Sequence, residues 1–174
     1  MKATLFTALF ISVAATAHAD VDQIALVLSG YDNAVSVSDL ARLSDDPVAD
    51  LIAVANDSAS RFFARGRAVQ LLGNYNEPRA HDALLAFSSH QLPLLRVRSL
   101  KAMSALASRD SAFAARTDIQ GALSSGLNDA DITVRLQAVR AMASIPAMHL
   151  TLAQHMQVEK EARVLDLTGE LLAK

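Results

Sequence analysis

Histidine, serine, aspartate and arginine are the residue types in this sequence that could do chemistry, and their spacing decides which chemistry is available. Four histidines follow residue 20, at positions 81, 90, 149 and 155, and none belongs to a His-Glu-x-x-His or Cys/His cluster. His149 and His155 are six residues apart, which places them on different faces of a helix. Cysteine and a Gly-x-Ser-x-Gly nucleophile motif are both absent from the sequence. We therefore expect no metal site, no cofactor and no enzymatic activity.

The segment 121–126 (GALSSG) has the glycine spacing of a phosphate-binding loop. Leu127 and Asn128 stand where that motif requires lysine and then serine or threonine. We interpret the segment as a helix that ends in glycine. Serine, histidine and aspartate are available for a catalytic triad, but no spacing in the sequence points to one.

An arginine recurs at positions 65, 96, 135 and 163, and the segments around these four positions superpose without gaps. In the first three copies, the residues at −1, +3, +4 and +7 from the arginine are small or apolar, which is one stripe of a 3.6-residue helix. A shorter apolar stripe precedes each arginine, and the fourth of these is less regular. The pattern predicts pairs of helices. The spacing of 39 between the second and third arginine predicts an inserted helical turn at residues 110–115.

Helix boundaries are marked by capping residues, proline and glycine. Asp46-Pro47 and Glu77-Pro78 each place a capping side chain before a proline at the first helical position. Gly73 lies where the second helix of the first pair should end. These signals predict helices that begin at residues 47 and 78.

Residues 128–142 (NDADITVRLQAVRAM) combine an Asn/Asp turn, a Val-Arg pair and apolar residues at helical spacing, and the segment resembles the second helix of HEAT repeats. The bacterial short-repeat branch called PBS-lyase-like is the most similar in length. The resemblance covers about residues 46 to 174. It implies an all-α fold, an α-solenoid of stacked antiparallel helix pairs with about four repeats. In the second unit, residues 90–93 (HQLP) carry no acid. The sequence therefore leaves open whether the acid–arginine pairs continue through this unit.

The sequence divides into three parts. Residues 1–19 are predicted to be a signal peptide, with a basic start, an apolar run and Ala17-His18-Ala19 before a cleavage site between Ala19 and Asp20. Residues 20–45 are predicted to form an N-terminal helical cap, with a partly disordered arm as the alternative. Residues 46–174 are the HEAT-like repeat domain. The alternative for the first part is an uncleaved N-terminal helix.

The signal peptide predicts that the protein is periplasmic or secreted. Its apolar run, residues 3–15, is shorter than the roughly 20 residues that a transmembrane helix needs, and no second such run follows. We therefore expect no membrane span.

The repeated arginines are interpreted first as structural residues. We expect the aliphatic stem to pack along its helix while the guanidinium binds the turn carboxylate or carbonyl groups of the next unit. This interpretation applies to four positions: Arg65, Arg96, Arg135 and Arg163.

Charge is distributed unevenly along the chain, whose formal net charge is −2. Residues 20–60 hold eight acids and one arginine, whereas residues 61–107 hold seven basic and two acidic residues. In HEAT-like stacks the second helices line the concave surface, so the resemblance implies a groove with basic and amide side chains. The candidate partner-binding residues are Arg67, Arg98, Lys101, Gln137 and Arg140. An ordinary solvated face, or neutralisation of the basic part by the acidic part within the molecule, are the alternatives.

A non-catalytic protein-interaction or scaffold module is the function that these observations favour. Its partner would be a protein, with an acidic segment bound in the groove. The alternative is a ligand or anion carrier accessory to a tetrapyrrole-type cofactor enzyme, which the PBS-lyase-like resemblance implies. Nucleic-acid binding ranks lowest because the chain after residue 19 has no basic excess. The identity of the partner and the oligomeric state stay open.

Overall fold

A computed structural model of the protein describes residues 21–30 and 35–173. Every regular element in these residues is helical, which confirms the all-α prediction for this part of the chain. The predicted signal peptide lies outside the described residues. None of the helices in the described ranges is both long enough and apolar enough to cross a bilayer.

The helices alternate along the chain between two sets. The first helices of the pairs are α3 (Pro47–Asn56), α5 (Pro78–Ser88), α8 (Thr117–Gly126) and α10 (His149–His155). The second helices are α4 (Phe62–Leu72), α6 (Pro93–Ala107), α9 (Ile132–Ala143) and α11 (Ala162–Leu172). The remaining elements are a helical stretch at residues 21–28, α2 (Val37–Leu43), α7 (Ser111–Ala114) and a short 3-10 helix, η1 (Pro146–Met148).

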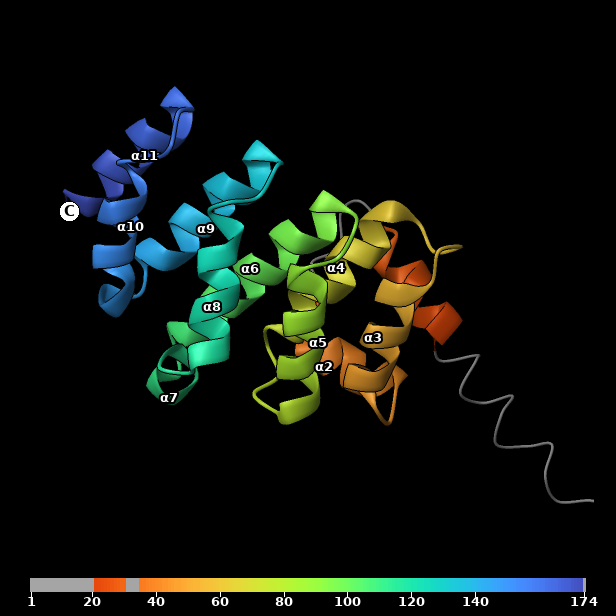
Figure 1. The fold of residues 1–174 in the computed structure, drawn as a ribbon. Helices are drawn as coiled ribbons and strands as arrows, with labels where there is room; N and C mark the ends of the chain where they lie inside the picture. Colours follow the sequence, from red (N-terminus) through yellow and green to blue (C-terminus); the bar gives the residue numbers. More distant parts are fainter. Residues whose placement is uncertain (1–20, 31–34, 174) are drawn as a thin grey trace, which may run out of the picture.

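Each second helix packs against the next one, in the order α4, α6, α9 and α11, while α5 packs between α3 and α8. Figure 1 shows the two sets as adjacent layers whose helices follow one another in chain order. The apolar stripe of the second helices is buried, with Val69, Leu100 and Val139 all at most 1% exposed. A single helix pair is too small to cover its own stripe, so the neighbouring pairs supply the rest of the core.

Side chains cap the starts of α2, α3, α7 and α9. Ser36 and Asp39 form a reciprocal capping box at α2, and the Asp46 side chain accepts a hydrogen bond from the backbone of Ala49 at 3.2 Å. The predicted cap at Glu77 is wrong, because its side chain makes no capping hydrogen bond. The Glu77 carboxylate instead accepts a hydrogen bond from Arg79 Nε at 3.2 Å, and its longer stem suits an N-cap less well than an aspartate.

The predicted inserted turn at residues 110–115 is confirmed as α7. Asp110 caps this helix by accepting hydrogen bonds from the backbone of Ala112 and Phe113, at 2.8 and 3.1 Å. Phe113 is only 2% exposed, and its ring lies 4.6 Å from the ring of His81. The insertion therefore adds a large side chain to the core between α5 and α8.

Close contact between α4 and α6 depends on Gly73, the residue that ends α4. A Cβ atom at this position would lie 2.8 Å from Ala102 Cβ and 2.9 Å from the backbone Cα of Ala102. Both distances are too short for a real contact, and backbone atoms cannot move aside as a flexible side chain can. Glycine at this position therefore allows the two helices to approach closely.

Candidate functional site

Arg96 connects the second helix pair to the turn of the third. Its Nε and Nη2 atoms donate to the two carboxylate oxygens of Asp129 at 2.7 and 2.8 Å, and Nη1 donates to the carbonyl oxygens of His90 and Gln91 at 2.8 and 3.0 Å. The Arg96 and Asp129 side chains are 15% and 14% exposed. Such a bidentate, mostly buried pair fixes the orientation of neighbouring units.

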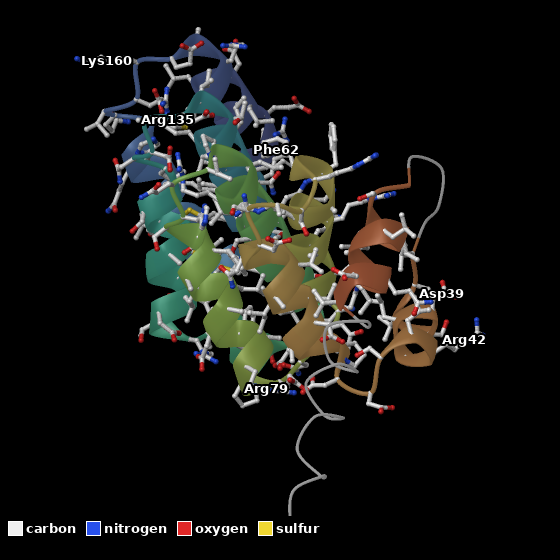
Figure 2. All side chains as sticks on the ribbon, turned by 90° about the vertical axis from the view of Figure 1, so that its right-hand side faces the viewer. Asp39, Arg42, Phe62, Arg79, Arg135 and Lys160 are labelled. Atoms are coloured by element: carbon white, nitrogen blue, oxygen red, sulfur yellow. The ribbon has the colours of Figure 1, made fainter. Side chains whose placement is uncertain are left out.

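Arg135 repeats this arrangement one unit later. Its Nε donates to Glu159 Oε2 at 3.0 Å, and its Nη1 donates to the carbonyl oxygen of Asp129 at 2.9 Å. Figure 2 shows Arg135, Lys160 and Phe62 along the same edge of the molecule, with Arg79 at the opposite edge. The structural interpretation of the repeated arginine is thus confirmed at Arg96 and Arg135.

The first and last arginines differ from this pattern. Arg65 Nε donates to the carbonyl oxygen of Ala55 at 2.9 Å, and the turn residue that follows it in the series is His90 rather than an acid. Arg163 is exposed and pairs with Glu161 at 3.2 Å. We call the series of arginines and turn residues, namely Arg65, His90, Arg96, Asp129, Arg135 and Glu159, the turn ladder.

Arg67, the first predicted groove residue, ties α4 to the N-terminal helical stretch. Its Nη1 donates to the carbonyl oxygen of Leu28 at 3.1 Å and also to that of Gly30. Carbonyl groups at the end of a helix have no partner within the helix, so this arginine satisfies them from outside. Arg67 therefore acts in positioning residues 21–30, and its side chain is half-buried.

Arg98 lies beside Arg67 on the next second helix, and its Nη1 donates to Gln70 Oε1 on α4 at 2.6 Å. Its Nε atom is buried and has no hydrogen-bond partner among the described residues. The predicted row of basic and amide side chains is therefore continuous from α4 to α6.

Lys101 and Arg140 are exposed on α6 and α9, and Gln137 is half-buried on α9. These three residues do not line the hollow that Arg67 and Arg98 share. The structure therefore brings only two of the five predicted residues together in one concave site.

That concave site, which we call the basic hollow, is lined by the side chains of Arg61, Phe63, Arg67 and Arg98 and by residues 28–30. Its volume is about 190 Å³, and it is open to solvent. A second hollow beside it shares Arg67 and Arg98 and adds Gln70. Neither is lined by aspartate or glutamate among residues 21–30 and 35–173.

Arg61 and Phe63 were not predicted from the sequence, because they precede the repeated apolar stripe. Their signal is the tripeptide Arg-Phe-Phe, in which two large aromatic residues open a helix. Phe62 and Phe63 are 52% and 58% exposed, and their rings lie 6.2 Å apart in an edge-on arrangement.

His81 is buried, and both of its ring nitrogens lie within hydrogen-bond distance of neighbouring side chains. Its Nδ1 lies 3.1 Å from Arg116 Nη1 and its Nε2 lies 2.9 Å from Asn76 Oδ1. An arginine only donates, so Nδ1 accepts and Nε2 carries the proton of a neutral ring. Burial lowers the pKa of His81, and the charge of Arg116 lowers it further. Across the described ranges, no group of three histidine, aspartate or glutamate side chains is placed to hold a metal ion.

Comparison with known proteins does not assign this chain to a family. No protein-family model matches it, and no curated protein matches its sequence. The HEAT-repeat assignment therefore stays a prediction from the residues.

Proposed function

We propose that the protein is a non-catalytic interaction module whose helix pairs stack as an α-solenoid of the HEAT-repeat kind. The order of packing supports this proposal, since each second helix packs against the next one along the series α4, α6, α9 and α11. About four repeats, at residues 46–174, follow an N-terminal cap at residues 20–45. The protein acts in the periplasm or outside the cell after cleavage between Ala19 and Asp20.

The observation that carries the function is the set of basic side chains on the exposed face of the second helices. The basic hollow includes Arg67 on α4 and Arg98 on α6, and Lys101 and Arg140 are exposed on α6 and α9. Basic side chains on neighbouring second helices attract an acidic segment of a protein partner and steer its approach. The turn ladder gives the face a fixed shape, because it holds consecutive units in register.

A capture experiment tests this proposal. The purified chain is used as bait in an extract of exported proteins from its source, and the captured partner is identified, purified and tested again alone. The variant Arg61→Glu/Lys101→Glu/Arg140→Glu should lose this partner, because all three substituted side chains are exposed cations of the proposed face. The control is Arg42→Glu/Arg79→Glu, which changes exposed cations away from the edge that holds Phe62 and should retain the partner. Equal capture by both variants, or no specific partner for the unaltered chain, would contradict the proposal.

The carrier alternative has less support from the geometry. The basic hollow, at about 190 Å³, is smaller than the roughly 300 Å³ at which pockets for drug-sized ligands begin, and a tetrapyrrole is larger still. An absorbance spectrum of the purified protein from its source tests the alternative directly. A visible chromophore that stays with the protein would favour the carrier function over the interaction module.

A further inference from the structure

The basic hollow brings together three arginine side chains, Arg61, Arg67 and Arg98. Arg67 is committed to the carbonyl groups of residues 28 and 30, and one N–H of Arg98 is committed to Gln70. Arg98 retains a buried Nε–H without a hydrogen-bond partner among the described residues, and Arg61 is exposed at the rim. Among the described residues, arginines are the charged side chains that line the hollow, which favours an anionic ligand there.

An apolar surface adjoins these arginines. Phe63 lines the hollow and is 58% exposed, and Phe62 lies beside it with its ring directed away from α4 into solvent (Figure 2). Exposed aromatic rings next to arginine are typical of the anchor points of protein interfaces. The hollow therefore combines a site for an anion with a site for an apolar side chain.

The charge distribution around the hollow favours a short anionic group over a long polyanion. The preceding part of the chain, residues 20–60, holds eight acids and one arginine, and it includes the helical stretch that forms one wall. A nucleic acid that extended beyond the hollow would meet this negative charge, whereas a single carboxylate would not.

Resting on the proposed function, we propose that the basic hollow is the anchor site for the partner and that it binds a peptide segment with a carboxylate side chain next to an apolar side chain. Arg61 and Arg98 bind the carboxylate, and Phe63 contacts the apolar residue. Arg67 is a positioning residue, because it holds the wall of residues 28–30 against α4. This anchor has a defined ligand chemistry, which the broader basic face lacks.

Titration of the full chain after residue 19 with synthetic peptides tests the anchor, with backbone amide NMR signals as the readout. The probe is a Gly/Ser nonapeptide with a central Glu-Leu pair, and the matched probes replace the glutamate by glutamine or the leucine by serine. We expect saturable shifts for amides near residues 28–30, 61–67 and 98, and about tenfold weaker binding when the glutamate is replaced. Replacement of the leucine should weaken binding about threefold to tenfold.

Protein variants assign the contacts. Arg61→Gln and Phe63→Ser change exposed side chains, so the fold should be retained, and each should weaken binding of the Glu-Leu peptide about threefold or more. Leu150→Ser and Arg42→Gln are the matched controls, because they change an exposed apolar and an exposed basic side chain that do not line the hollow, and they should leave binding unchanged. Arg98→Gln should weaken binding most, and its circular dichroism spectrum reports whether the helices remain.

Several outcomes would overturn the anchor. One is equal binding of the Glu-Leu and Gln-Leu peptides, and another is the absence of saturable shifts at millimolar peptide. A third is a loss of peptide binding in the control variants as large as that in Arg61→Gln and Phe63→Ser. Inorganic phosphate that shifts the same amides at lower concentration than the peptide would identify an anion site instead. If the captured partner is lost with Lys101→Glu/Arg140→Glu but retained with Arg61→Gln/Phe63→Ser, the anchor is wrong while the proposed function stands. Capture of no partner rejects the proposed function whatever the peptides show.

Discussion

Glu159 is the most strongly perturbed carboxylate in the described part of the chain, and it ends the turn ladder. Burial would raise the pKa of this carboxyl. The backbone N–H groups of Glu161 and Lys160, together with His155 and Arg135, outweigh burial and lower the pKa from 4.5 to about 2. The side chain is only 7% exposed, so these contacts are weakly screened by solvent.

Replacement of Glu159 by glutamine should therefore destabilise the protein. A depressed carboxyl pKa adds stability that is complete above pH 4.5 and is lost as the pH falls toward 2. We expect Glu159→Gln to lower the free energy of unfolding by about 2 to 3 kcal/mol at pH 7. The difference from the unaltered protein should shrink at pH 3, as measured by urea unfolding. Glu161→Gln, at a more exposed pair, should cost less than about 1 kcal/mol. A cost for Glu159→Gln that does not change with pH would contradict this account.

His81 should make the stability of the protein fall on acidification, as Glu159 does, but over a higher pH range. Its pKa is lowered by burial and by Arg116, so its neutral form adds stability that is complete above about pH 6.5 and declines as the pH falls. We expect His81→Gln to cost about 1 to 3 kcal/mol at pH 8 and less at pH 5. Urea unfolding of both proteins at the two pH values measures this change. A cost that grows on acidification would show that the ring is charged in the folded protein.

The sequence predicted the repeated arginines and their role, but not the partners of His81. The arginine recurs at regular intervals, so the pattern is visible in the chain. Arg116 and Asp110 lie 35 and 29 residues after His81, and only the packing of α7 and α8 against α5 brings them near it. Nothing in local spacing predicts such a contact.

At the scale of the elements, glycine fixes the distance between α4 and α6. Gly73→Ala should lower the free energy of unfolding by about 2 to 3 kcal/mol, because the added Cβ meets the backbone of Ala102. Gly121→Ala is the matched control, since its Cβ enters open space within α8 and should stabilise the protein by about 0.5 to 1 kcal/mol. Urea unfolding of both variants measures the two signs. Equal effects at the two glycines would contradict the close approach of α4 and α6.

The turn ladder lacks an acid at one position, and a substitution can supply it. His90 Nδ1 accepts the backbone N–H of Leu92 at 3.0 Å, as Asp129 Oδ1 accepts that of Asp131 at 2.8 Å. His90→Asp should keep this hydrogen bond and place a carboxylate near Arg65, which stabilises the protein by about 0.5 to 1 kcal/mol.

His90→Asn is the matched control for the charge, because it retains an acceptor without the carboxylate. The difference in thermal midpoint between the two variants isolates the interaction with Arg65. If asparagine stabilises the protein as much as aspartate does, the turn ladder does not depend on acid–arginine pairs.

Helix positions were predictable from the sequence because apolar spacing, proline and capping residues are local signals. The starts at residues 47 and 78, the end at Gly73 and the turn at 110–115 all follow these signals. The cap at Glu77 was wrong because a neighbouring arginine competes for the carboxylate. The basic hollow was only partly predictable. Arg67 and Arg98 follow from the repeat, whereas Arg61 and Phe63 required the position of residues 28–30 against α4.

At the scale of the whole molecule, the acidic and basic parts of the chain do contact each other. Arg79 on α5 donates to both carboxylate oxygens of Asp46, the residue before α3, at 2.7 and 2.9 Å. This pair is about half exposed and lies at the edge opposite to Arg135 (Figure 2), so it neutralises little of the basic hollow.

Hydrogen exchange of the chain with and without its captured partner tests the central claim most directly. Backbone amides exchange more slowly where a partner covers or stabilises them. The stacked arrangement with its basic face predicts slower exchange in the first turn of α4, in residues 28–30 and along α6. Slower exchange confined to α5 and α8, the first helices on the other layer, would contradict it.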